Sequence, residues 1–206
     1  MKVAITGSTG GIGKVICDLL ESNNINVIKL QIDLSNDFDI DLSELDGLIH
    51  CAGVNYIFEY QDISFNDFEK LININSLSFL RLCQKLKFNH GANIIAIGSL
   101  YATSVKPHRL MYSFSKHGLI SMVKTLALEM SSNKIKVNMI SPGFVDTSLT
   151  RKNNTQERIE QLNNLIPLGL TPPEEIAKMC KYLVLENQSI TGQNLIIDGG
   201  YNCLEP

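Results

Sequence analysis

Runs of aliphatic and β-branched residues alternate with helix-type runs along the whole chain, and this order is the strongest constraint on the fold. The strand-type runs are Val3–Thr6, Val27–Ile32, Phe38–Leu42, Leu48–Ala52, Asn93–Gly98, Ile135–Ile140 and Leu195–Ile197. The helix-type runs are Gly11–Ser22, Phe65–Phe88, His108–Met130, Gln156–Leu165 and Pro173–Leu185. Strands that alternate with helices predict a doubly wound α/β domain, with a mostly parallel sheet of about six to seven strands and helices on both faces.

The composition indicates one globular domain over residues 1–206. A chain with 44% hydrophobic residues and a formal net charge of −3 can bury a core and is not disordered. It has no block of Lys and Arg, which argues against nucleic acid or a membrane as partner. The five cysteines lack the spacing of redox pairs or zinc sites, so no metal site is predicted. The sequence has no apolar run of roughly 20 residues and no signal-peptide pattern, so we expect a cytoplasmic location.

A glycine-rich turn links the first predicted strand to the first predicted helix. Its residues are Thr6, Gly7, Ser8, Thr9, Gly10, Gly11, Ile12 and Gly13. Glycine lets the backbone turn sharply and approach a phosphate closely, and the following helix N-terminus favours negative charge. The spacing differs from the commoner G-x-G-x-x-G fingerprint and from a Walker loop. The turn therefore either binds the pyrophosphate of a dinucleotide or only packs the helix against the strand.

The residues at the end of the second predicted strand bear on the choice between NAD and NADP. An acidic residue at this place can bind the ribose hydroxyl groups of NAD. Gln31 can hydrogen-bond hydroxyl groups, and Asp33 would repel a 2′-phosphate. No Arg stands here to bind that phosphate, although Lys29 is near. The predicted cofactor is NAD or NADP, with a slight preference for NAD.

Tyr112 and Lys116 stand near the start of the helix-type run His108–Met130 and share one helix face. The ammonium group can therefore lower the pKa of the phenol toward neutrality, as a general acid or base requires. A surface tyrosine above a solvated lysine is the simpler alternative. Ser99 follows the strand-type run Asn93–Gly98, at the carboxyl end where open α/β sheets bind ligands, and this favours the functional interpretation.

Taken in order along the chain, these motifs resemble those of the short-chain dehydrogenase/reductase family. The matching elements are Thr6-Gly7-x3-Gly11-Ile12-Gly13, Ala52-Gly53, Asn75, Ser99, Tyr112-x3-Lys116 and Pro142-Gly143-Phe144-Val145-Asp146-Thr147. Thr191-Gly192-Gln193 and Asp198-Gly199-Gly200 are similar to the closing strand of oxoacyl-thioester-reductase-like members. The resemblance covers essentially the whole chain and implies a single Rossmann domain that is shortened between Ile32 and Leu48.

The resemblance also implies a role for each matching residue. Tyr112 would exchange a proton with the substrate, and Ser99 would hydrogen-bond the carbonyl oxygen. Lys116 would lower the pKa of Tyr112 and bind the nicotinamide ribose, and Asn75 would hold a water molecule that links Lys116 to solvent. The implied cofactor-binding residues are Gly7, Ser8, Thr9, Gly11, Ile12, Gly13, Ala52, Gly53, Tyr112, Lys116, Pro142, Gly143, Val145 and Thr147.

The chain departs from the family pattern at two places. His50-Cys51-Ala52-Gly53 stands where the family has Asn-Asn-Ala-Gly, and we expect His50 to be a packed strand residue rather than a catalyst. The family also places an Asp after its third strand, against the adenine. We prefer Asp41-Leu42 to Asp33-Leu34 for this element, because Phe38–Ile40 can form a short strand before it.

These features predict an oxidoreductase that interconverts a small-molecule carbonyl and a secondary alcohol by hydride transfer with NAD or NADP. By resemblance, residues of about 148–170 would cover the substrate, and the protein would be a homodimer or homotetramer. The alternative is a non-catalytic dinucleotide-binding or redox-sensing module of the same fold. The presence of Ser99, Tyr112 and Lys116 disfavours that alternative. A sugar-nucleotide epimerase of the extended branch would need a separate substrate domain, which we do not expect in this chain.

Overall fold

Six strands form one sheet in the computed structural model, which describes residues 1–152 and 154–204 except for the side chain of Leu149. The strands are β1 (Lys2–Thr6), β2 (Asn26–Leu30), β3 (Leu45–His50), β4 (Phe88–Ile97), β5 (Lys136–Pro142) and β6 (Asn194–Ile197). Their order across the sheet is β2-β1-β3-β4-β5-β6, and every neighbouring pair is parallel. The predicted doubly wound α/β fold is thus confirmed, and the winding direction reverses between β1 and β3.

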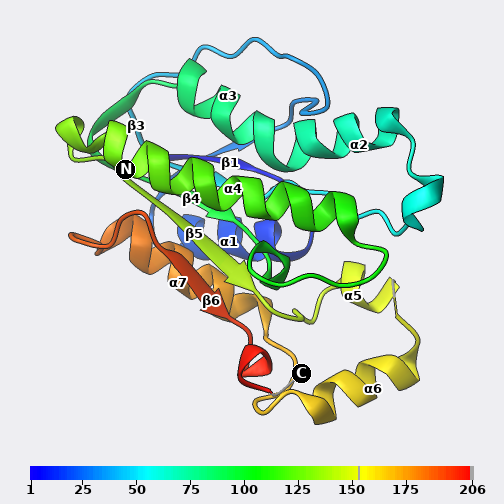
Figure 1. Ribbon diagram of the computed structural model, residues 1–206. Helices are drawn as coiled ribbons and strands as arrows, with labels where there is room; N and C mark the ends of the chain where they lie inside the picture. The colour runs from blue at the N-terminus through cyan, green and yellow to red at the C-terminus, as the bar shows by residue number, and fades with distance from the viewer. Residues whose placement is uncertain (153, 205–206) are drawn as a thin grey trace.

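Helices cover both faces of the sheet (Figure 1). α1 (Gly11–Ser22) and α7 (Pro173–Leu185) pack together on one face. On the other face lie α2 (Phe65–Ile72), α3 (Ser78–Lys85) and α4 (Leu110–Glu129). Two further helices, α5 (Ser148–Lys152) and α6 (Gln156–Leu165), lie beyond the carboxyl end of β5. Within the described ranges, no helix has both the length and the apolar character needed to cross a membrane.

Each face of the sheet has its own apolar core. Ile16 and Leu20 of α1 are fully buried and pack in one core with Ile176 of α7. The core on the opposite face contains Phe79 of α3 and Leu119 of α4, which are also fully buried. Burial of one such side chain stabilises the fold by about 1.5–3 kcal/mol. The two cores therefore hold the ends of the strands in fixed positions, and those ends carry the site described below.

The predicted helix over Phe65–Phe88 is interrupted and ends early. A π-helical segment, Asn73–Leu77, separates α2 from α3, and β4 already begins at Phe88. π-helical turns are rare and are frequent at functional sites. Asn75, within this turn, is fully buried and hydrogen-bonds Ser115 of α4. The interruption thus brings a polar side chain between two helices.

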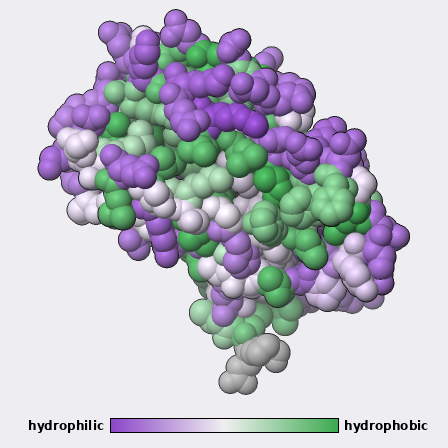
Figure 2. Space-filling view, turned by 45° about the horizontal axis from the view of Figure 1, so that its top comes forward, coloured by the Kyte–Doolittle hydropathy of each residue, from purple (hydrophilic) through white to green (hydrophobic). Residues whose placement is uncertain are grey.

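The predicted strand Phe38–Leu42 is not formed, and residues 31–44 cross from β2 to β3 without regular structure. Phe38, Ile40 and Leu42 are half-buried against the core on the α3 side, whereas the acidic residues between them are exposed. Figure 2 shows hydrophilic side chains over the top of the molecule, where this segment and α3 lie. Apolar and acidic residues alternate here because one side of the segment covers the core and the other faces solvent. This arrangement requires no partner strand. Its ion pairs with neighbouring residues include Asp37–Arg81, Asp37–Lys85, Asp39–Lys85 and Asp41–Lys87.

Candidate active site

A cavity of about 500 Å³ opens at the carboxyl ends of β1, β3, β4 and β5. Open α/β sheets bind ligands at this edge, next to the point where the winding direction reverses. Most of the predicted site residues share this cavity although they are far apart in the sequence. Those that line it are Gly7, Gly11, Ile12, Ala52, Gly53, Ser99, Tyr112, Lys116, Pro142, Gly143, Val145 and Thr147.

The β1–α1 turn depends on glycine for two different reasons. Gly7 has a φ of +67°, and a Cβ atom there would lie 2.7 Å from the backbone nitrogen of Ala52. At Gly13, a Cβ atom would collide with the carbonyl oxygen of Gly7. Gly11 faces open space instead, because the nearest atom to an added Cβ would be 3.8 Å away, on Thr147. Gly7 and Gly13 therefore let α1 pack against β1, and Gly11 leaves room in the cavity.

The same turn presents hydrogen-bond donors without partners. α1 has no side-chain cap at its N-cap residue Gly10, so no side chain there occupies its first N–H groups. The hydroxyl of Ser8 is buried and has no hydrogen-bond partner among the described residues, and Thr9 beside it is exposed. Free N–H groups, an unpartnered hydroxyl and the space at Gly11 together fit a phosphate group of a dinucleotide.

Tyr112 and Ser99 meet in the cavity. Burial raises the pKa of Tyr112 above its ordinary value of 10.0, and hydrogen bonding with Ser99 partly opposes this effect. The Ser99 oxygen also accepts a hydrogen bond of 3.2 Å from the backbone N–H of Tyr101, which orients the hydroxyl. Tyr112 is therefore protonated at neutral pH. This differs from the near-neutral pKa that its spacing to Lys116 predicts, because the largest effect on the phenol is burial.

Lys116 lies one helical turn after Tyr112 and is 3% exposed. Its Nζ is 5.7 Å from the centre of the Tyr112 ring and donates a hydrogen bond of 2.9 Å to the carbonyl oxygen of Ile97. Burial lowers the pKa of Lys116 to about 8. The ammonium group can therefore lose and regain a proton near neutral pH, beside the phenol.

Asn75 connects the loop after β3 to the helix that carries Lys116. Its Nδ2 donates to the carbonyl oxygen of Val54 at 2.9 Å and to the hydroxyl of Ser115 at 3.1 Å. Its Oδ1 accepts from the backbone N–H of Val54 at 2.8 Å. A Cβ atom at Gly53 would lie 3.4 Å from Oδ1 of Asn75 and 3.7 Å from Nζ of Lys116. Asn75 does not line the cavity but lies directly behind its wall.

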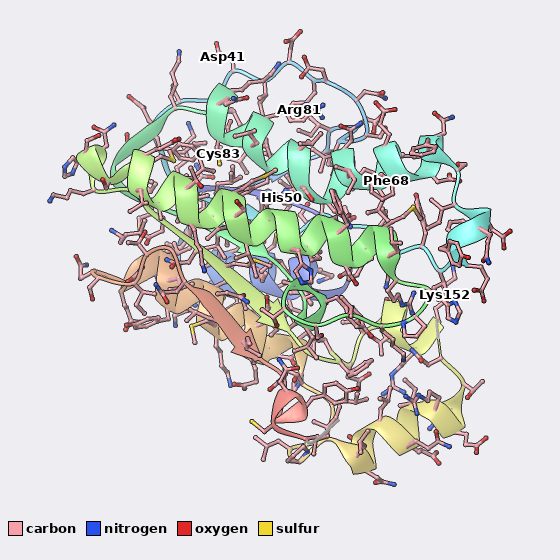
Figure 3. All side chains as sticks on the ribbon, viewed as in Figure 1. Asp41, His50, Phe68, Arg81, Cys83 and Lys152 are labelled. Carbon is pink, nitrogen blue, oxygen red and sulfur yellow. The ribbon has the colours of Figure 1, made fainter. Side chains whose placement is uncertain are left out.

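His50 is fully buried beneath the site (Figure 3). Its Nδ1 is 3.0 Å from Oγ1 of Thr6 at the end of β1, and its Nε2 is 3.4 Å from Oγ of Ser78 at the start of α3. Burial, with a smaller effect of Lys116, lowers the pKa of His50 to about 3. His50 is thus a neutral, packed strand residue that connects β1 to α3.

The buried His50 should make the folded state sensitive to acid. An unfolded histidine binds a proton with a pKa of 6.5 but folded His50 only near pH 3, so the unfolded chain is protonated first as the pH falls. We expect His50 to lower the free energy of unfolding by about 3 kcal/mol between pH 7 and pH 4.5. Urea unfolding of His50→Gln should show a correspondingly weaker dependence on pH. The exposed His90→Gln is the control, and an unchanged dependence in His50→Gln would contradict the expectation.

The residues predicted to contact the adenosine do not line the cavity. Gln31 and Asp33 follow β2 at the carboxyl edge of the sheet, and both are exposed. Hydrogen bonds from the turn that follows Asp33 lower the pKa of its carboxyl group. Asp41 and Leu42 lie at the opposite edge, where the Leu42 carbonyl accepts a hydrogen bond from Lys87 just before β4 (Figure 3). The expected placement of Asp41 and Leu42 beside the adenosine is therefore corrected, because the chain returns to the amino edge without forming a strand.

Eighteen further residues that line the cavity lie outside the predicted catalytic and cofactor-binding residues. The ring of Tyr101 lies edge-on to that of Tyr112, with centroids 6.0 Å apart, and Tyr201 makes a similar contact with Phe144 at 5.2 Å. Closeness in sequence to Ser99 and Tyr112 could have pointed to Tyr101 and its neighbours, but Tyr201 reaches the cavity only through folding. The additional residues include Asn55, Tyr101, Ser104, Lys106, Arg109, Phe144, Arg158 and Tyr201.

An excursion of the chain covers one side of the cavity. The two ends of this excursion are joined by a parallel bridge between Val145 and Thr171, and the residues between them form α5 and α6. Ile159 and Leu162 of α6 are buried, and Leu162 also lines the cavity. The excursion coincides with the predicted substrate lid at residues 148–170, of which residue 153 lies outside the described residues.

Known proteins resemble this chain in sequence and in fold. A family model described as enoyl-(acyl carrier protein) reductase matches residues 33–202. The 3-oxoacyl-[acyl-carrier-protein] reductase FabG of Chlamydia trachomatis is 41% identical over 109 residues, which cover 52% of this chain and 44% of that protein. The chain spans less than half the length of the curated relatives that it matches.

Solved structures match over almost the whole chain. A short-chain dehydrogenase family protein from Francisella tularensis has a TM-score of 0.89 and 27% identity, with 98% of this chain and 99% of that chain covered. A 4-hydroxyisoleucine dehydrogenase mutant complexed with NADH and succinate has a TM-score of 0.86 and 26% identity, with 100% of both chains covered. The similarity thus extends across the sheet, the cavity and the segment that covers it.

Proposed function

The chain belongs to the short-chain dehydrogenase/reductase family, and we propose that it is an NAD(P)-dependent oxidoreductase that interconverts a carbonyl and a secondary alcohol. The observation that carries this proposal is the shared cavity. Ser99, Tyr112 and Lys116 line it together with the glycine turn. A nicotinamide cofactor, when bound, supplies or accepts the hydride. The side chains of this protein then have to orient the carbonyl and move one proton.

In the direction of reduction, Tyr112 donates its hydroxyl proton to the carbonyl oxygen of the substrate. Burial favours this role because it raises the pKa of Tyr112 and keeps the proton on the phenol until it is needed. The hydroxyl of Ser99 donates a hydrogen bond to the same oxygen and stabilises its developing negative charge. The positive charge of Lys116 then stabilises the phenolate that remains. Oxidation of an alcohol runs through the same steps in reverse.

The proton lost by Tyr112 has to return from solvent. Lys116, with a pKa of about 8, can give a proton to the phenolate and regain one. Asn75 holds the loop beside Nζ of Lys116 through its two hydrogen bonds to Val54. We therefore give Lys116 a catalytic role and Asn75 a positioning role in this transfer.

The dinucleotide would lie along the carboxyl edge of the sheet. We assign its phosphate groups to Gly7, Ser8, Thr9, Gly11 and Ile12, next to the buried Gly13. The nicotinamide end would contact Ala52, Gly53, Pro142, Gly143, Val145 and Thr147. Lys29, the cation nearest in sequence to Gln31 and Asp33, is paired with Glu21 at 2.8 Å, and we keep the slight preference for NAD over NADP.

A kinetic screen tests the proposed function. NADH and NADPH oxidation is followed with a panel of ketones, aldehydes and oxo acids, and turnover of at least one carbonyl compound is expected. Cofactor binding is measured in parallel by calorimetry. Tight binding of a dinucleotide without turnover of any carbonyl would favour the alternative, a non-catalytic dinucleotide-binding module.

A second copy of the chain is the proposed cover for the outer faces of α2 and α4. Phe65, Leu110 and Phe114 are 91%, 52% and 58% exposed. The ring of Phe114 lies 5.3 Å from that of Phe68, which Figure 3 places beside α4, so these side chains form one apolar surface. Sedimentation velocity should show a homodimer or homotetramer, and Phe114→Glu should shift it to smaller species. A wild-type monomer at every concentration would overturn this proposal.

A further inference from the structure

The charges that line the cavity are all of one sign. Lys106, Arg109, Lys116 and Arg158 line it, and no Asp or Glu of the described residues does so. The whole chain has a net charge of −3, so this concentration of cations is not a reflection of the overall composition. A cleft lined by charges of one sign attracts ligands of the opposite sign.

Two of these cations gather around one tyrosine next to the reactive phenol. Burial raises the pKa of Tyr101, and the positive charges of Arg109 and Arg158 partly oppose this effect. The charge of Arg109 also acts on Tyr112. The ring centre of Tyr101 is 6.0 Å from that of Tyr112. Arg109, Arg158 and Tyr112 all line the same cavity, so a ligand inside it is within reach of both guanidinium groups and of the Tyr112 hydroxyl.

Both guanidinium groups keep donors available for a ligand. Arg109 is oriented by a hydrogen bond of 3.2 Å to Oδ1 of Asn55, and Arg158 donates to Oε1 of Gln161 at 3.3 Å. Neither forms an ion pair with a carboxylate of the described residues. Arg151, just outside the cavity, is already engaged by both oxygens of Asp146 at 2.7 Å each. Arginine has five N–H donors in a planar fork that matches a carboxylate.

A cofactor phosphate is the other anion that the cavity has to hold, but the donors for it are elsewhere. The glycine turn and the uncapped N-terminus of α1 follow β1. Lys106 and Arg109 precede α4, and Arg158 lies on α6. The cations therefore belong to the wall formed by the segment after Ser99 and by the covering excursion, next to Tyr112.

We propose that the substrate is a short oxo acid, whose carboxylate binds to Arg109 and Arg158 while its carbonyl group lies at Ser99 and Tyr112. This inference rests on the oxidoreductase function proposed above. Lys106, which is exposed at the cavity, adds to the attraction without a fixed contact. A neutral carbonyl compound of the same size would leave both guanidinium groups without an anionic partner.

Matched acid and ester pairs test the proposal. Pyruvate, acetoacetate and levulinate are compared with their methyl esters, which keep the carbonyl group and remove the negative charge. We expect kcat/KM to be about 10- to 100-fold higher for at least one acid than for its ester, as charge-assisted hydrogen bonds imply. Esters that react as well as the acids, or better, would overturn the inference and leave the oxidoreductase function intact.

Arginine variants show whether the named side chains are responsible. Arg109→Gln and Arg158→Gln should each raise KM for the acid about 10- to 100-fold with a much smaller change in kcat. The KM of the ester and the affinity for NADH and NADPH should stay unchanged. Lys152→Gln is the control, because this exposed lysine of α5 (Figure 3) does not line the cavity. Equal losses for acid and ester, or a loss confined to NADPH affinity, would overturn the assignment.

A binding measurement separates this inference from the proposed function. Calorimetry of the acids and esters on Tyr112→Phe, loaded with NAD, measures affinity in the absence of proton transfer. Tighter binding of an acid than of its ester, lost when Arg158→Gln is added, would support the carboxylate site. This result would hold even if no carbonyl compound is turned over. Equal or undetectable binding of acid and ester would contradict it.

Discussion

Tyr112→Phe should lower kcat for carbonyl reduction by about 10²- to 10⁴-fold, the contribution usual for a positioned general acid. The substitution removes the only atom of this side chain that can give a proton, while the ring stays edge-on to Tyr101. Stability should change little, by about 1 kcal/mol, because one hydrogen bond with Ser99 is lost. The measurement is single-turnover reduction with saturating cofactor, together with urea unfolding of the same sample.

Ser99→Ala provides the comparison. In the proposed mechanism Ser99 orients the carbonyl but transfers no proton, and loss of one such donor costs about 10²- to 10³-fold in kcat. The two effects should not add in the double variant, since both act on the same oxygen. If Tyr112→Phe reduced every carbonyl compound with the same kcat as the wild type, the proposed mechanism would be wrong.

Gly13→Ala should unfold the β1–α1 turn or prevent cofactor binding. The new methyl group would collide with the carbonyl oxygen of Gly7, a backbone atom that cannot move without shifting the turn. We expect the free energy of unfolding to fall by about 3 kcal/mol, at the upper end of the usual cost of overpacking. Any folded fraction should bind NADH and NADPH at least about 10-fold more weakly than the wild type. The reason is the loss of one phosphate contact, which contributes about 1.5–3 kcal/mol. Urea unfolding and calorimetry measure the two effects.

Gly118→Ala is the matched control for this substitution. Gly118 lies inside α4, and a Cβ atom there would meet no heavy atom within 4 Å. Alanine is favoured over glycine in a helix by about 1 kcal/mol, so this variant should be slightly more stable than the wild type. A Gly13→Ala variant as stable as Gly118→Ala would show that the turn does not require glycine at position 13.

Local spacing accounts for the parts of the site that the sequence predicts well. Gly7, Gly11 and Gly13 lie in one turn, and Tyr112 and Lys116 lie on one helical face, so backbone geometry alone brings each group together. The alternation of strands and helices predicts a parallel sheet, in which all strands end at the same carboxyl edge. Ser99 follows one of these strands and is therefore expected at that edge. These relations need no knowledge of long-range packing.

The segment between β2 and β3 shows where such reasoning ends. Phe38, Ile40 and Leu42 alternate with acidic residues as in a strand, but their apolar sides cover the core beside α3. Period-two burial is what a strand and a segment laid over a core have in common, so the pattern alone could not distinguish them. Because no strand forms, Asp41 lies at the amino edge of the sheet instead of the expected carboxyl edge.

The sequence by itself determined the doubly wound fold, the glycine turn and the Tyr-Lys pair, because each depends on residues that are neighbours along the chain or on a regular alternation. Only the tertiary structure decided that burial has the largest effect on the pKa of Tyr112, which it raises. It also decided that Arg109, which precedes α4, and Arg158 of α6 line one cavity with Tyr101. The raised pKa of Tyr112 depends on desolvation, and the cluster of cations depends on residues brought together across the fold. The spacing of residues along the chain predicts neither of them.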